Sequence, residues 1–83
     1  MSLISSIRRE EFRFYEATGK KPTRVYLGGD AWFAFAKELQ TLGFDTNPGH
    51  MPDPSLRFDG MHITLTQGGD RHIGMSYDEK DVW

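Results

Sequence analysis

Hydrophobic and polar positions recur along the chain with two different periods, one typical of helices and one typical of strands. In residues 30–42 the apolar side chains fall on one side of a helix and the polar ones on the other. Asp30 stands where a helix N-cap belongs, and Gly43 stands where the helix ends. The pattern predicts an amphipathic helix with one buried face, on which Phe44 folds back against Leu39. The buried set is Trp32, Phe35, Ala36, Leu39 and Leu42.

A second stripe at helical spacing predicts an earlier helix that begins at Ser2 or Ser5 and ends near Thr18. Gly19 ends this helix, and Pro22 prevents its continuation. Glu11 lies in the middle of the stripe. We interpret it as a carboxylate at the edge of the core that pairs with a neighbour such as Arg8; the alternative is a carboxylate held at an interface or site. The apolar members of the stripe are Leu3, Ile4, Ile7, Phe14, Tyr15 and, at its margin, Phe12.

Alternating apolar and polar residues predict the strands. Residues 23–27 form one strand, with Val25 and Leu27 on its buried face. Residues 56–58 form a short strand, followed by a tight turn or a bulge at Asp59-Gly60. Residues 61–66 and 72–77 then alternate in the same way and predict a hairpin. Its register pairs Leu65 with Ile73 and Ile63 with Met75, because a slip by one residue would separate the two apolar sets.

These elements predict an α+β fold of two layers, with two helices packed on one face of a small mixed or antiparallel sheet and the element order α-β-α-β-β-β. Residues 1–77 form the single domain. Residues 78–83 form an acidic tail, which we expect to fray unless Trp83 docks. The other face of the sheet is open and polar. It presents Arg24, Tyr26, His62, Thr64, Thr66 and Ser76.

The composition restricts the class of protein. At 83 residues the chain is one domain. It contains no cysteine, which excludes disulfides and thiolate metal sites and suits a reducing cytoplasm. We find no targeting segment and no apolar run long enough to cross a bilayer, so we expect a cytoplasmic location.

The basic residues in the first third of the chain suggest an alternative function, nucleic-acid binding. The formal net charge of −2 argues against it, because binding to polyphosphate depends on clustered lysine and arginine. Motifs of the common nucleic-acid-binding folds are also missing. The alternative stays open because Phe12 and Tyr26 lie among the basic residues and offer stacking platforms. The basic residues are Arg8, Arg9, Arg13, Lys20, Lys21 and Arg24.

Catalytic and metal-binding patterns are weak in this sequence. His50, His62 and His72 are not spaced as metal-ligand motifs, and in the hairpin register His62 and His72 lie too far apart to share one ion. No serine or pair of carboxylates points to a catalytic cleft. We therefore expect no enzyme activity, metal or cofactor.

The residues that favour protein–protein contact are exposed aromatics and a long loop. Phe33 lies off the buried stripe of the second helix, and Trp83 closes the polar tail. Residues 45–55 contain three prolines and no periodicity, which predicts a loop longer than most. Aromatic residues and methionine are enriched in interface cores. The predicted contact residues are Phe33, Trp83, Tyr26, His50 and Met51.

The chain resembles small proteins encoded by tailed phages and prophages. The resemblance rests on residues 21–27 (KPTRVYL), the following helix with Trp32 and Leu39, and residues 57–63 (RFDGMHI). Many such proteins are uncharacterised or act in morphogenesis by assembly, and the resemblance implies no catalytic residues. With the composition, it leads us to expect a non-enzymatic assembly protein that acts as a homo-oligomer or an adaptor.

Overall fold

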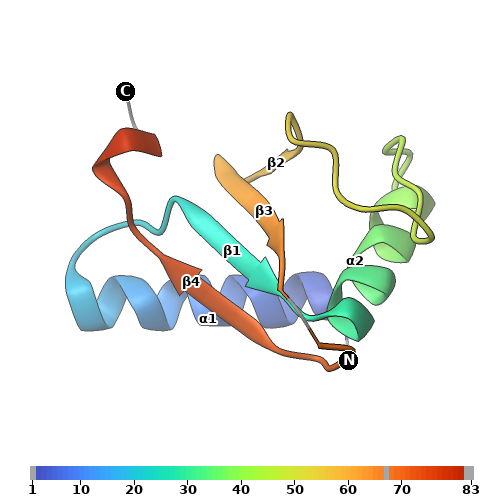
Figure 1. Ribbon diagram of the computed structural model, residues 1–83. Helices are drawn as coiled ribbons and strands as arrows, with labels where there is room; N and C mark the ends of the chain where they lie inside the picture. Colours follow the sequence, from blue (N-terminus) through green and yellow to red (C-terminus); the bar gives the residue numbers. More distant parts are fainter. Residues whose placement is uncertain (1, 67, 82–83) are drawn as a thin grey trace.

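The structure is a computed structural model that describes residues 2–66 and 68–81 (Figure 1). Its element order confirms the α+β class and the order predicted from the sequence. The elements are α1 (Leu3–Thr18), β1 (Arg24–Leu27), α2 (Gly29–Thr41), β2 (Arg57–Phe58), β3 (Met61–Leu65), β4 (Ile73–Ser76) and a 3₁₀ turn, Glu79–Asp81.

The four strands form one mixed sheet in the order β2-β3-β1-β4. β1 runs parallel to β3 and antiparallel to β4. The predicted hairpin of the last two long strands is therefore wrong, because β1 lies between them. Val25 and Leu27 of β1 are completely buried. This agrees with the central position of β1, because neighbouring strands cover both of its edges.

The residues paired in the predicted register nevertheless lie at the same level of the sheet, with one residue of β1 between them. Val25 lies between Ile63 on one side and Met75 on the other. Side chains at one level of a sheet point to the same face, so these rows form the apolar floor of the core. The next row is Leu65, Leu27 and Ile73.

Both helices cover this floor, and the core lies between the two layers. Its centre is Phe35 of α2, which is fully buried together with Ile7 of α1. Three residues predicted to be buried are instead exposed. Leu42 is 65% exposed, because α2 ends at Thr41 and Leu42 is already its C-cap. Phe12 is 62% and Tyr15 is 56% exposed, so the stripe of α1 is buried mainly near its start.

The length of α1 explains the exposure of Phe12 and Tyr15. Its 16 residues span about 24 Å, whereas the strands of four or five residues span roughly 13 to 17 Å. The C-terminal half of α1 extends past the ends of the strands (Figure 1). Phe12 and Tyr15 lie on that half and stay exposed, whereas Phe14 is partly buried.

The two helices are capped in different ways. Of the two predicted caps of α1, Ser2 is the one observed, since its Oγ accepts from the amide of Ser5 at 3.3 Å. Asp30 does not cap α2, because Gly28 is the N-cap and Asp30 lies within the first turn. Carbonyl groups of the loop before β4 take the place of a capping side chain: the amides of Asp30 and Ala31 both donate to the carbonyl of Asp70.

Glycines terminate both helices as the sequence predicts. Gly19 has φ of 73° after α1, and Gly43 has φ of 97° after α2. The amide of Phe44 donates to the carbonyl of Leu39 at 3.0 Å, which is the backbone bond of a Schellman ending.

Residues 78–81 fold back onto Thr23 and Arg24, at the start of β1. Asp81 accepts hydrogen bonds from Thr23 Oγ1 and from Arg24 Nη2, each at 3.1 Å. The amide of Asp78 donates to Thr23 Oγ1 at 2.9 Å. Polar contacts therefore connect this segment to the start of β1. Trp83 lies outside the described residues.

Candidate interaction surface

The exposed half of α1 borders a hollow, which we call the α1 hollow. Phe12 and Tyr15 provide its aromatic side, and Pro22 approaches from the segment between α1 and β1. Its volume is about 370 Å³. Three charged residues complete the lining: Arg8, Glu11 and Lys21. Apolar side chains with a charged rim are typical of sites that bind another protein.

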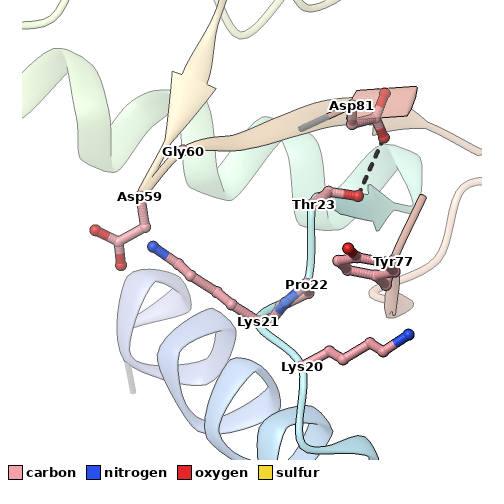
Figure 2. A pocket seen from close by; sticks show the side chains of 8 residues that line it. All are labelled: Lys20, Lys21, Pro22, Thr23, Asp59, Gly60, Tyr77 and Asp81. Atoms are coloured by element: carbon pink, nitrogen blue, oxygen red, sulfur yellow. Dashed lines mark hydrogen bonds between the residues drawn. The ribbon is translucent and has the colours of Figure 1, made fainter. Parts of the chain in front are cut away.

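A second hollow of about 460 Å³ shares Lys21 and Pro22 with the first (Figure 2). Tyr77 forms one side, and the ammonium of Lys20 lies 4.7 Å from the centre of its ring, a cation–π contact. Figure 2 shows the side chain of Lys21 extending toward Asp59. The segment from Lys20 to Pro22 therefore separates two neighbouring hollows, and both carry cationic and aromatic groups.

Charges of both signs meet where α1 passes the turn between β2 and β3. Asp59 and Gly60 form this turn with φ of 51° and 79°, which confirms the predicted tight turn. Arg8 Nη1 lies 3.5 Å from Asp59 Oδ2. Burial first, and the negative charge of Asp59 second, raise the pKa of Glu11 above its ordinary value. Glu11 is thus a partly buried carboxylate at the edge of the core, as predicted, but Arg8 pairs with Asp59 and Glu11 faces that second carboxylate.

Replacing Glu11 with glutamine is expected to leave the free energy of unfolding at neutral pH unchanged or to raise it by up to about 1 kcal/mol, since a repelled carboxylate is removed. The folded state binds this proton more tightly than the unfolded state. The wild type therefore gains stability relative to the variant as pH falls through the raised pKa toward the ordinary value of 4.5. Urea unfolding of both proteins at neutral and acidic pH measures the difference. A clear loss of stability in Glu11→Gln at neutral pH would contradict this view.

The loop of residues 45–55 is tied to α2 at two points. Trp32 Nε1 donates to the carbonyl of His50 at 2.7 Å, and Thr46 Oγ1 donates to the carbonyl of Ala36 at 2.8 Å. Met51 is 75% exposed between these anchors and the sheet. A hollow of about 330 Å³ on the open face of the sheet is lined by Met51 together with Arg24 and other residues. The loop is therefore a fixed projection with an apolar tip.

The predicted contact residues are spread over several surfaces. Phe33 is half exposed on α2, with the ammonium of Lys37 5.4 Å from its ring centre. Tyr26 lies on the open face of the sheet, where its hydroxyl accepts from Ser76 Oγ. His50 and Met51 share the loop. Trp83 is not described.

The basic residues of the nucleic-acid alternative do not form one uniform stripe. Arg8 pairs with Asp59, and Arg13 pairs with Glu10 at 3.2 Å. Arg24 belongs to the sheet and not to α1, and it forms an ion pair with Asp81. The hydrogen bond from Arg24 lowers the pKa of the Asp81 carboxylate. Interspersed carboxylates reduce the positive potential that phosphate binding needs. Arg9, Lys20 and Lys21 complete the predicted set.

The polar groups near the second hollow serve the fold. Thr23 Oγ1 donates to Asp81 and accepts from the amide of Asp78, so its hydroxyl is occupied. His62 Nε2 lies 3.8 Å from Asp81 Oδ1. Among residues 2–66 and 68–81, no three histidine or carboxylate side chains are placed to hold a metal ion.

Sequence reasoning placed Tyr15 in the buried stripe of α1 and considered Phe12 as a surface residue only in the nucleic-acid alternative, so it missed the hollow that these two side chains border. One signal was available: the apolar stripe of α1 is longer than any of the predicted strands. It also missed Glu38 of α2, whose carboxylate binds the first turn of α1. That contact joins two helices and has no local pattern.

Comparison with known proteins adds no relative. No family model matches the chain, and neither the curated proteins nor the solved structures give a match. The resemblance to phage proteins therefore stays a prediction. In the described part of the chain, neither helix has the length and apolar content needed to cross a membrane.

Proposed function

We propose that this chain is a non-enzymatic protein–protein interaction module, an adaptor or assembly protein whose α1 hollow receives a segment of a partner. The observation that carries the proposal is the exposure of Phe12 and Tyr15 beside Pro22, in a hollow outside the core. Burying two aromatic rings on binding provides a large favourable free energy.

The surroundings of these rings support a partner of mixed character. Arg8 and Lys21 supply cations at the rim, and Glu11 supplies an anion. Fold elements hold the rings in place: α1 is capped at both ends, and Pro22 follows a glycine-terminated helix. A preformed site of this kind loses little conformational entropy when it binds.

Peptides selected from a random library on the wild-type protein test the proposal. Phe12→Ser is expected to weaken their binding about tenfold or more, because a central aromatic contact is lost. Titration by calorimetry measures the affinity. Phe33→Ser is the matched control, since Phe33 is also an exposed phenylalanine on a helix but lies outside the hollow.

The control also separates the possible contact surfaces. Binding lost in Phe33→Ser and kept in Phe12→Ser would move the contact surface to α2. Selected ligands that ignore both substitutions would overturn the proposal for the α1 hollow. Circular dichroism of each variant verifies that it is folded.

A further inference from the structure

The loop of residues 45–55 carries an apolar projection at Met51, which borders the hollow on the open face of the sheet and stays largely exposed. Met51 is 75% exposed and is followed by Pro52, Asp53 and Pro54. The loop is nevertheless held in position by the bonds from Trp32 and Thr46 to the backbone. Fixed exposed methionine and proline side chains are suited to enter an apolar hollow.

The charges of this loop and of the α1 hollow are complementary. Residues 45–55 contain Asp45 and Asp53 and no lysine or arginine, which gives a formal charge of −2. The lining of the hollow contains two cations, Arg8 and Lys21, and one anion, Glu11, which gives a formal charge of +1. Opposite potentials of this kind orient two surfaces as they meet.

Hydrogen bonds within the loop hold the carboxylate of Asp53 in its ionised form. The amide and Oγ of Ser55 both donate to its Oδ1 at 2.8 Å. These bonds lower the pKa of Asp53, so the carboxylate is ionised at neutral pH. Among the described residues Asp53 has no ion pair, whereas Lys21 lies at the rim of the hollow.

The projection lies on the open face of the sheet, whereas the hollow lies on α1, which covers the other face. Figure 1 shows the loop beside α2 at one end and the C-terminal end of α1 at the other. The loop therefore does not reach the hollow of its own chain. Contact between two different surfaces of identical chains is heterologous, and it closes into a ring or continues as a filament.

We propose that the Met51 projection of one copy of this chain seats in the α1 hollow of the next copy. Met51 packs against Phe12 and Tyr15, and Asp53 approaches Lys21. This inference rests on the proposed function, because it names the partner of the same hollow. The expected product is a head-to-tail assembly that grows with protein concentration.

Two single variants test the inference by mass measurement in solution. Met51→Ser removes the projection and keeps the hollow, while Phe12→Ser alters the hollow and keeps the projection. Both side chains are more than 60% exposed, so the fold should tolerate either change. Each variant alone is expected to be a monomer, with self-association weakened about tenfold or more. Leu42→Ser is the control, since Leu42 is equally exposed but belongs to neither surface, and it should assemble like the wild type.

Mixing the two variants gives the decisive result. The intact hollow of Met51→Ser and the intact projection of Phe12→Ser make one contact only, so the mixture should form a 1:1 dimer and nothing larger. A mixture that stays monomeric, a variant that assembles alone, or a wild type that remains a monomer at its highest soluble concentration overturns the inference. Selected peptides that still depend on Phe12 in that case would leave the proposed function standing.

Discussion

Gly28→Ala is expected to lower the free energy of unfolding by about 3 kcal/mol. Gly28 has φ of −66°, which any residue adopts, so the glycine is needed for space and not for its backbone angle. A Cβ at this position would overlap the carbonyl oxygen and Oδ1 of Asp70, and it would lie 2.9 Å from the carbonyl carbon of that residue. A backbone group cannot rotate away as a flexible side chain can, so the loop before β4 must move.

Movement of that loop would also remove the cap of α2. Gly29 donates to the carbonyl of Gly68 at 3.0 Å, and Asp30 and Ala31 donate to that of Asp70 at 3.1 and 3.2 Å. No side chain caps α2 in their place. The amides at this helix end would lose their protein partners together, which adds to the cost of the overlap.

Urea unfolding at neutral pH measures this effect, and Gly69→Ala is the matched control. Gly69 belongs to the same loop, but a Cβ there would meet no atom within 4 Å. The control should therefore stay within about 0.5 kcal/mol of the wild type. A Gly28→Ala protein as stable as the control would show that the contact with Asp70 does not fix the strand-to-helix corner.

The parts of the fold that sequence predicted correctly depend on residues near one another in the chain. The start of α1 at Ser2, the glycine endings at Gly19 and Gly43, and the Asp59-Gly60 turn are all local features. The buried face of α2 follows from spacing alone, apart from Leu42 beyond its last turn. Local patterns hold here because tertiary contacts reinforce them.

The order of strands depends on contacts that a local pattern does not specify. Alternation identified residues 61–66 and 72–77 as strands, and a turn-rich connection made a hairpin the simplest pairing. Backbone hydrogen bonds at the two ends of β1 place this strand between them instead. The amide of His62 donates to the carbonyl of Thr23, and the amide of Gly28 donates to the carbonyl of His72. Inserting β1 keeps the same apolar rows together, so the hydrophobic pattern fits both topologies equally well.

The candidate surface was predictable only in part for a related reason. The loop at Met51 was recognised from its prolines, because composition alone marks it. The α1 hollow was not recognised, because the exposure of Phe12 depends on where the sheet ends beneath α1. Relative lengths of packed elements follow from the assembled fold and not from the period of one helix.

The contact between the two helices at their ends gives the second large prediction. The first turn of α1 contains no acidic residue, yet its amides face the carboxylate of Glu38 on α2. Glu38 Oε2 accepts from the amide of Leu3 at 2.6 Å, and Oε1 accepts from the amide of Ile4 at 3.2 Å and from Ser2 Oγ at 2.6 Å. One side chain thereby satisfies free donors of α1 and places a negative charge at the positive end of its dipole.

Glu38→Gln is expected to lower the free energy of unfolding by about 2 kcal/mol at neutral pH, because hydrogen bonds to a charged acceptor are lost. Glutamine has the same shape but only one acceptor atom, and its NH₂ group would face amide donors. Chemical unfolding of the wild type and the variant measures the loss. Glu16→Gln, an exposed change at the other end of α1, is the control and should stay within about 0.5 kcal/mol of the wild type.

The pH dependence of this difference identifies its cause. Burial alone raises the pKa of Glu38, but the hydrogen bonds from Ser2, Leu3 and Ile4 outweigh it and lower the pKa below its ordinary value of 4.5. A carboxylate with a lowered folded pKa contributes its full stability above the unfolded value and loses it as pH falls through the folded one. The wild type should therefore lose its advantage over Glu38→Gln on acidification below 4.5. A difference that stays constant over this range would mean that packing, and not the charge at the end of α1, accounts for the effect.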